Sequence, residues 1–199
     1  MNVFVTGGAG YIGSVCVEEL LNAGHQVTVF DNLIEGHRSA VDPRARFIQG
    51  DLMDRKQTLD ALKSSGASGI IHFAAFALVG ESMQNPTKYF ANNVAGALNL
   101  IDAAVTIGIR KFVFSSTCAT YGPPSQVPIV EDIPQKPINP YGESKLIVEQ
   151  MLRWYREIHR LEFVAFRYFN AAGASQRYGE HHRIETHLIP NILKVALGQ

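Results

Sequence analysis

Residues 2–14 read NVFVTGGAGYIGS, and this stretch decides the fold. Asn2 to Val5 is a short apolar run, rich in β-branched and aromatic side chains, of the kind that forms a buried parallel strand. The run leads directly into three glycines spaced Gly7-x-x-Gly10-x-x-Gly13. Such glycines let the backbone turn tightly, approach a pyrophosphate without a Cβ in the way, and pack the next helix close to the strand. The pattern predicts a strand that feeds a phosphate-binding turn.

The residues after the glycines complete a dinucleotide-binding pattern. Tyr11 to Ala23 carries apolar residues at helical spacing, which predicts an amphipathic helix whose N-terminal amides face an anion on the turn. Gln26 to Phe30 is a second strand ending at Asp31, whose carboxylate is placed to bind an adenosine ribose diol. The same charge would repel a 2′-phosphate, so NAD is favoured over NADP. Glycines alone mark many ordinary turns, but here all the parts occur in the required order.

Composition narrows the class of protein. The chain has 199 residues and 46% hydrophobic content, enough for one good core. Lys+Arg and Asp+Glu are both 18, and a net charge of zero points to no nucleic-acid or membrane partner. Cys16 and Cys118 form no CxxC pair, so we expect no disulfide framework. With no targeting leader and no stretch of membrane-spanning length, we expect a cytoplasmic protein.

Strand and helix patterns alternate along the rest of the chain. Further strands are expected at residues 46–48, 69–73, 111–114 and 162–166, and further helices at residues 54–63, 86–106 and 141–159. Six strands with intervening helices predict an α/β fold, a doubly wound parallel sheet of the Rossmann type. The helices at 86–106 and 141–159 carry enough apolar surface for a dimer contact, although each is equally suited to cover the sheet of its own subunit.

Several strand ends carry residues suited to a ligand. Asp51 follows the third strand and is placed either to accept the adenine amino group or to cap the helix that starts near Asp54. The small residues after Phe73 suit close approach of a ligand, although a tight turn needs them equally. In the helix at 86–106, Asn92 or Asn93 needs a polar partner, either the cofactor or neighbouring backbone.

Hydroxyl side chains end the fifth strand at Ser115, Ser116 and Thr117, at the edge where open α/β sheets bind ligands. A proline-rich loop then leads to Tyr141, and Lys145 lies one helical turn further on the same face. Tyrosine is a weak base at neutral pH, but a nearby ammonium and an oxidised nicotinamide would both favour phenolate. We predict that Tyr141 takes a proton from a substrate hydroxyl as hydride leaves the same carbon. Thr117 would hold that hydroxyl or relay its proton, and Lys145 would hold the nicotinamide ribose and lower the pKa of the tyrosine.

Six segments together resemble the extended short-chain dehydrogenase/reductase family, and within it the epimerases of nucleotide sugars. They are residues 6–14 (TGGAGYIGS), 31–33 (DNL), 80–82 (GES), 114–117 (FSST), 141–145 (YGESK) and 167–170 (RYFN). The resemblance covers essentially the whole chain. It implies a tightly held NAD that oxidises C4 of the sugar, a 4-keto intermediate that turns over, and hydride return to the opposite face. UDP-galactose and UDP-glucose would then interconvert.

The resemblance also implies roles for single residues. The implied cofactor contacts are Gly7, Gly10, Tyr11, Ile12, Gly13, Asp31, Asn32, Asp51, Leu52, Phe73, Ala74, Ala75, Asn92, Ser115, Tyr141, Lys145 and Tyr168. The implied substrate contacts are Ser116, Thr117, Tyr141, Asn170, His187 and Leu188, with Thr117, Tyr141 and Lys145 as the catalytic set. Residues 1–170 would form the NAD-binding domain and residues 171–199 the start of the UDP-sugar region, in a homodimer.

Members of the family continue well beyond 199 residues, so the chain resembles their N-terminal portion, and we expect it to bind NAD but to turn over UDP-sugars poorly. Ala77 stands where the family often has a lysine on the cofactor phosphates. Two alternatives stay open: an epimerase or decarboxylase/dehydratase for another nucleotide sugar, and a non-catalytic NAD-binding fragment. A dehydratase would place an acidic pair at Cys118 to Thr120, which favours the epimerase.

Three histidines, His181, His182 and His187, lie near the end of the chain. A metal site there is open in principle. We find no carboxylate or cysteine at a spacing that completes a ligand set, so we predict a polar loop over the substrate and no metal.

Overall fold

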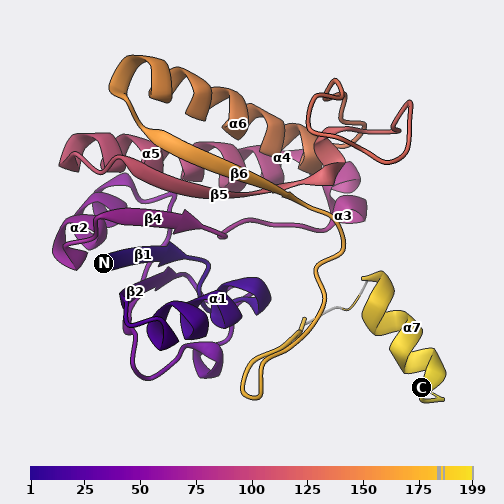
Figure 1. Cartoon of the computed structure of the whole chain (residues 1–199), viewed down its shortest axis with the longest axis horizontal. Helices are drawn as coiled ribbons and strands as arrows, with labels where there is room; N and C mark the ends of the chain where they lie inside the picture. The colour runs from indigo at the N-terminus through magenta and orange to yellow at the C-terminus, as the bar shows by residue number, and fades with distance from the viewer. Residues whose placement is uncertain (183–184, 186, 199) are drawn as a thin grey trace.

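The computed structural model describes residues 1–182, 185 and 187–198, and its centre is one six-stranded sheet (Figure 1). All neighbouring strands pair in parallel, in the order β3-β2-β1-β4-β5-β6. The strands are β1 (Asn2–Thr6), β2 (Gln26–Asp31), β3 (Arg46–Gln49), β4 (Gly69–His72), β5 (Lys111–Thr117) and β6 (Glu162–Tyr168). The predicted doubly wound parallel sheet is therefore confirmed.

The α-helices are α1 (Tyr11–Asn22), α2 (Arg55–Ser65), α3 (Val79–Gln84), α4 (Pro86–Tyr89), α5 (Gly96–Ile107), α6 (Pro140–His159) and α7 (Leu188–Ala196). Short 3-10 turns occur at η1 (Arg38–Ala40) and η3 (Cys118–Thr120), and a π-helical segment, η2 (Phe90–Ala95), joins α4 to α5. The helix predicted at 86–106 is thus one helical rod with a π-helical middle. The short helix α3 was not predicted.

Side-chain caps fix where two of these helices begin. The Asp54 carboxylate accepts a hydrogen bond of 2.9 Å from the Gln57 amide at the start of α2. Asn139 does the same for α6, accepting 2.8 Å from the Gly142 amide, with Pro140 at the first helical position. Asp54 is therefore the cap of α2, and the capping role considered for Asp51 is wrong.

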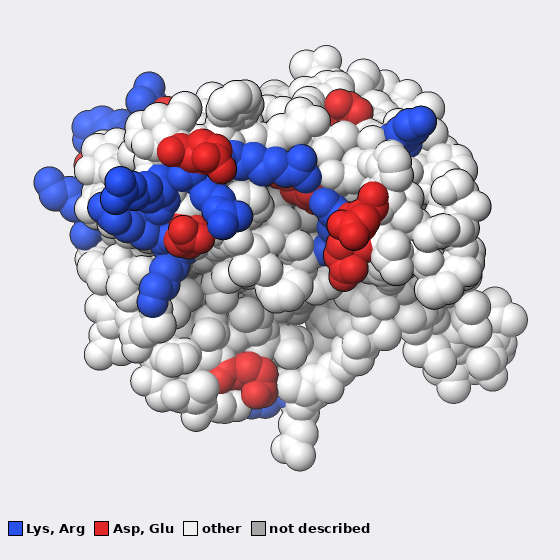
Figure 2. Space-filling view, turned by 45° about the horizontal axis from the view of Figure 1, so that its top comes forward, with Lys and Arg blue, Asp and Glu red and all other residues white. Residues whose placement is uncertain are grey.

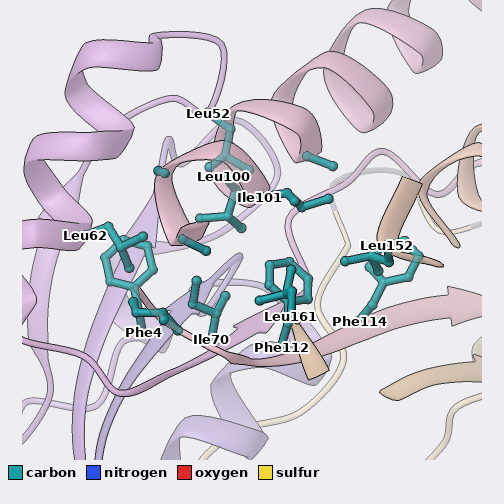
Figure 3. Close-up of a cluster of buried hydrophobic side chains, with 14 of the residues drawn as sticks. Phe4, Leu52, Leu62, Ile70, Leu100, Ile101, Phe112, Phe114, Leu152 and Leu161 are labelled. Carbon is teal, nitrogen blue, oxygen red and sulfur yellow. The ribbon is translucent and has the colours of Figure 1, made fainter. Parts of the chain in front are cut away.

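Helices cover both faces of the sheet because alternate residues of its strands are apolar on both sides. In β1, Phe4 joins a core between the sheet and α2, α5 and α6, whereas Val3 and Val5 join a second core against α1. Figure 3 shows the first core, in which strand side chains face helix side chains: Phe4, Ile70, Phe112, Leu62, Leu100, Ile101 and Leu152. The two cores hold the strand ends, and the loops that follow them, in fixed positions.

The helical rod Pro86–Ile107 is long and apolar enough to cross a membrane, by length and composition only. Its inner face is part of the core, since Leu100, Ile101 and Ala104 are fully buried. A helix buried against a sheet can be as long and as apolar as one that crosses a membrane.

The end of the chain packs less closely than the rest. Figure 1 shows α7 apart from the main body, and α7 buries none of its described residues. On β6, which forms one edge of the sheet, Val164 is 51% exposed and Phe166 is 50% exposed. Charges are mixed on the face drawn in Figure 2, where Lys and Arg side chains gather at the upper left with Asp and Glu among them. This mixture accords with the zero net charge.

Candidate dinucleotide site and catalytic residues

The three glycines of the turn between β1 and α1 are required for different reasons. Gly7 has φ +71°, and a Cβ there would lie 2.5 Å from the Ala74 amide nitrogen. A Cβ on Gly13 would lie 2.1 Å from the Gly7 carbonyl oxygen. Gly10 has an ordinary φ of −87°, and among the described residues its Cβ would approach only that oxygen, at 3.4 Å. Folding therefore requires Gly7 and Gly13, whereas Gly10 leaves space beside the helix N-terminus for a ligand.

The start of α1 has the features of an anion site. Gly10 is the N-cap residue and offers no side chain to the first amides of this 12-residue helix. Those amides, at Tyr11, Ile12 and Gly13, have no partner within the helix because they belong to its first turn. The helix dipole adds positive potential at the same point. A pyrophosphate would satisfy these donors.

Asp31 stands at the end of β2 with its carboxylate held by backbone. It accepts hydrogen bonds from the amides of Ala9, at 3.0 Å, and Leu33, at 2.8 Å, and it is only 8% exposed. Burial raises the pKa of Asp31, and the two amide bonds oppose that rise. The carboxylate is thus fixed in direction at the wall of the groove described next, as a ribose diol would require.

A groove runs along the carboxyl ends of β1, β2 and β4. Ten predicted cofactor residues line it: Gly7, Gly10, Asp31, Asn32, Asp51, Leu52, Phe73, Ala74, Ala75 and Asn92. Six further lining residues were not predicted: Phe30, Ile34, Glu35, Gly36, Gly50 and Phe76. The loop after β2 reaches the groove because the His37 amide donates to the Ala9 carbonyl oxygen at 2.9 Å. The glycine at position 36 was the one sequence feature that could have predicted this close approach. The loop passes so near the glycine-rich turn that a Cβ at position 36 would lie 2.9 Å from the Ala9 Cβ.

Two ambiguous predictions are resolved by side-chain contacts. The Asp51 carboxylate accepts from the Asn32 amide group at 3.1 Å and from the Met53 amide at 2.8 Å, and it lines the groove. Asn93 is buried and binds backbone: it accepts from the Phe76 amide at 2.9 Å and donates to the Phe76 carbonyl oxygen at 3.0 Å. Asn92 lines the groove instead.

The predicted catalytic residues lie close together at the end of β5. Thr117 is the last residue of this strand, and it lies close enough to Tyr141, in the first turn of α6, for its hydroxyl to lower the pKa of the phenol. Lys145 is buried, with its ammonium nitrogen 6.0 Å from the Tyr141 ring centre and 2.8 Å from the Ser115 carbonyl oxygen, to which it donates. Tyr168, at the end of β6, pairs with Thr117 in the sheet. Strand pairing and the capped start of α6 thus bring the catalytic set together.

The ionisation of this set differs from the prediction. Burial raises the pKa of Tyr141, and the hydrogen bond with Thr117 lowers it in part. Burial also lowers the pKa of Lys145 to about 7. Lys145 is not among the groups that lower the pKa of Tyr141, and its nitrogen donates to the Ser115 carbonyl oxygen and is itself desolvated. The predicted joint effect of Lys145 and an oxidised nicotinamide on Tyr141 stays a prediction.

Ser116 does not face the same side of the strand as its neighbours. Its hydroxyl is buried and donates to the Glu149 carboxylate at 2.5 Å. Glu149 also accepts from the Arg167 guanidinium at 2.8 Å and from the Gln135 amide group at 3.0 Å. The structure therefore does not support Ser116 as a substrate contact. Sequence reasoning missed Glu149, although it lies one helical turn after Lys145.

The remaining predicted contacts lie after β6 or face it. The Tyr11 hydroxyl donates to the Gly173 carbonyl oxygen at 2.6 Å, so its side chain contacts the segment after β6. Asn170 is exposed in that segment. His187 is the N-cap residue of α7 and Leu188, at 60% exposed, is its first residue. His187 and Leu188 are not among the described residues that line the groove.

Contrary to the expectation that no carboxylate completes a ligand set with the histidines, two carboxylates lie beside His182 and His187. Glu180, His182, Glu185 and His187 each bring one ligand atom into a group whose atoms lie within 4.8 Å of one another. The sequence pattern did not show this because no single helical or strand period relates all four residues, and the path of the loop brings them together.

These features define a class of protein. A parallel sheet in the order 3-2-1-4-5-6, a glycine-rich turn before its first helix and an acid at the end of its second strand make a dinucleotide-binding domain of the Rossmann type. A tyrosine and a buried lysine on α6, next to the end of β5, place ionisable groups beside this domain's sheet edge.

The chain belongs to the NAD dependent epimerase/dehydratase family, whose model matches residues 3–199. It is 55% identical to a UDP-glucose 4-epimerase of Lacticaseibacillus casei over 200 residues, covering 100% of this chain and 60% of that protein. It is 50% identical to a UDP-glucose 4-epimerase of Streptococcus mutans, covering 100% and 61%. The chain thus spans about 60% of the length of the curated relatives it matches.

Solved structures of similar fold are also named UDP-glucose 4-epimerase. The fold matches a UDP-glucose 4-epimerase from Brucella ovis in complex with NAD with a TM-score of 0.96 at 47% identity, over 99% of this chain and 61% of that one. It matches a UDP-glucose 4-epimerase from Bifidobacterium longum in complex with NAD+ and UDP with a TM-score of 0.93 at 34% identity, over 100% and 63%. The predicted resemblance to nucleotide-sugar epimerases is confirmed.

Proposed function

We propose that this chain holds NAD in the groove and carries the reaction centre of a UDP-glucose 4-epimerase, which interconverts UDP-galactose and UDP-glucose. The observation that carries the proposal is the grouping of Thr117, Tyr141 and buried Lys145 at the sheet edge where the glycine-rich turn also lies. Relatives named UDP-glucose 4-epimerase at up to 55% identity support the choice of reaction.

The chain's own residues fit the cofactor. The open space at Gly10 and the first amides of α1 suit its pyrophosphate, and the fixed Asp31 carboxylate suits the adenosine ribose. Asp51 and Leu52 line the groove near that end and are assigned to the adenine. When bound, NAD supplies the acceptor for hydride from sugar C4 and the donor that returns it.

The proton is handled by the protein. Thr117 holds the C4 hydroxyl against Tyr141. The phenolate form of Tyr141 takes the hydroxyl proton as the C4–H bond gives up hydride, and the resulting phenol returns the proton to the C4 oxygen when hydride comes back to the opposite face of C4. Because burial, and to a lesser extent Cys118, keeps the pKa of Tyr141 high, the proton is taken only when the site is filled by positive charge and closed to water. Lys145 contributes by turning from Ser115 to the cofactor ribose.

The substrate and assembly assignments complete the proposal. We assign residues 1–170 to NAD binding and residues 171–199, with Asn170, to the start of the UDP-sugar region. The protein is a cytoplasmic homodimer that needs neither nucleic acid nor membrane. Exposed apolar side chains on two helices support a dimer contact: Phe90 and Leu98 on the 86–107 rod, and Trp154 and Ile158 on α6.

The test is conversion of UDP-galactose to UDP-glucose, with NAD binding measured on the same samples. It is run on the chain and on a chimera in which residues 1–199 replace the matching segment of the L. casei enzyme. We expect Tyr141→Phe to lower turnover about 10²- to 10⁴-fold with NAD binding retained. Tyr155→Phe, on the same helix but bonded to Asp102, is the matched control and should keep turnover within about twofold.

Three results would contradict the proposal in different ways. A Tyr141→Phe chimera as active as its parent would remove the proton-transfer role. Activity only with UDP-pentoses or UDP-hexuronates would favour the epimerase or decarboxylase of another nucleotide sugar. NAD binding without turnover in the chimera would favour a non-catalytic module.

A further inference from the structure

The loop between β6 and α7 brings two imidazoles and two carboxylates to one point. The His182 Nδ1 lies 3.3 Å from a Glu180 oxygen and 3.2 Å from a Glu185 oxygen. The His187 Nδ1 lies 3.6 Å from the same Glu180 oxygen and 2.8 Å from the other Glu185 oxygen. The two histidine rings are 4.4 Å apart between centres. We call these four residues the Glu/His cluster.

The nitrogen–oxygen separations in the cluster are close to those of a tetrahedral coordination shell. Zinc bonds of about 2.0–2.2 Å to nitrogen and oxygen place neighbouring ligand atoms roughly 3.3–3.6 Å apart at a tetrahedral site. Three of the four nitrogen–oxygen separations in the cluster are 3.2, 3.3 and 3.6 Å. A small movement of His187 away from Glu185 would bring the fourth into range.

The negative charge of the cluster also favours a bound cation. The side chains of Glu180 and Glu185 are only 17% and 10% exposed, so water screens their mutual repulsion poorly. A neutral imidazole nitrogen carries at most one proton, yet the His182 Nδ1 faces an oxygen of each carboxylate. A divalent cation between them would satisfy both carboxylates and accept both nitrogen lone pairs.

We propose that Glu180, His182, Glu185 and His187 bind one zinc-like divalent cation as a closed, structural site. Two imidazoles with two carboxylates form a donor set that suits Zn²⁺ and related transition ions better than Ca²⁺ or Mg²⁺, which prefer oxygen alone. His187 would then serve as a metal ligand rather than as a sugar contact.

The position of the Glu/His cluster beside the glycine-rich turn indicates what a bound ion would do. The His182 ring packs edge-on against the Tyr11 ring, at 6.3 Å between centres, and the Tyr11 hydroxyl holds Gly173. Tyr11 is the first residue of α1, directly after the glycine-rich turn. The bound ion would therefore fix the loop before α7 against the turn that binds pyrophosphate, with His187, the N-cap of α7, as one of its ligands.

The test uses the metal-free chain at pH 7.5. Zn²⁺ is titrated in competition with a chromogenic chelator, and Co²⁺ is added separately to record a visible absorption spectrum. The variants are His182→Ala and Glu185→Gln. The matched control is His181→Ala, because His181 is the adjacent residue and stacks on His37, 4.8 Å between ring centres, outside the cluster.

We expect one Zn²⁺ per chain and an intense tetrahedral Co²⁺ spectrum in the wild type and in His181→Ala. Each cluster variant should bind Zn²⁺ about 100-fold more weakly or worse, because a four-ligand site loses one donor. Circular dichroism of each variant confirms that the loss is local.

The proposal is overturned if the wild type binds no stoichiometric Zn²⁺, or if His181→Ala weakens binding as much as His182→Ala. A weak octahedral Co²⁺ spectrum also overturns it, since the cluster would then be a hydrogen-bonded group of ion pairs. Failure of NAD binding in every protein would instead count against the proposed function and leave the zinc result standing.

Discussion

Substitution of Gly10 by alanine separates ligand binding from folding. The backbone at Gly10 has φ −87° and ψ 178°, which alanine adopts without strain. The nearest described atom to the added Cβ is the Gly7 carbonyl oxygen, at 3.4 Å. An alanine in a compatible conformation stabilises a protein by about 0.4–1 kcal/mol through the unfolded state. We therefore expect the free energy of unfolding to stay the same or to rise by up to about 1 kcal/mol.

The effect on NAD is expected to be large and opposite. The methyl group would occupy the space through which a pyrophosphate reaches the first amides of α1. Loss of one hydrogen bond to a charged group costs about 1.5–3 kcal/mol, which raises the NAD dissociation constant roughly 10- to 150-fold. Calorimetric titration with NAD and urea unfolding without NAD measure the two quantities on the same protein.

Two other glycine substitutions serve as comparisons for Gly10→Ala. Gly13→Ala places a Cβ 2.1 Å from the Gly7 carbonyl oxygen, so it should lower both stability and NAD binding. Gly80→Ala, in α3, meets no described atom within 4 Å and should change neither by much. If Gly10→Ala keeps its stability and binds NAD like the wild type, the pyrophosphate does not lie on this turn and the reasoning fails.

Two other predictions concern buried polar groups. Lys145→Met should remove a pH dependence of the free energy of unfolding. Burial lowers the pKa of Lys145 to about 7, so between pH 7 and about 10.5 this lysine is protonated in the unfolded chain but not in the folded one. As the pH rises over that range, the free energy of unfolding of the wild type should increase relative to that of the variant by roughly 3–5 kcal/mol, measured by urea unfolding. A difference between the two proteins that does not change with pH would contradict this. Asn93→Ala frees the Phe76 backbone and the Ser144 hydroxyl, so we expect a loss of about 2–4 kcal/mol and weaker NAD binding. Asn92→Ala should leave stability nearly unchanged, and equal losses would contradict the assignment.

The glycine-rich start and the parallel sheet followed from local rules, whereas the strand order was shown by the structure. In β1, alternation of Val3, Phe4 and Val5 already indicates a strand buried on both faces, because side chains of a strand point alternately to opposite sides. Asp31 could be placed because it ends a strand that must lie beside β1. Tyr141 and Lys145 share a helix face by spacing alone. These predictions needed only neighbours within one or two elements.

Contacts between distant segments were decided by the tertiary structure. The sequence could not show that the Ser116 hydroxyl meets Glu149, 33 residues away, or that Asn93 rather than Asn92 binds the Phe76 backbone. It could not show that the Lys145 ammonium faces the Ser115 carbonyl oxygen, on which the ionisation of Tyr141 depends. Hydrogen-bond partners and pKa values are set by what surrounds a group in three dimensions, and desolvation in particular leaves no local pattern.

What the sequence determined by itself was therefore the parallel sheet, the phosphate-binding turn and the residue types at the ends of its strands, because periodicity and glycine spacing are properties of adjacent residues. The folded chain alone decided which of those side chains face the groove, which are bonded in the interior, and that Glu180 and Glu185 meet His182 and His187. These depend on the packing of α6 against β5 and on the path of the loop after β6, which bring together groups that no local spacing relates.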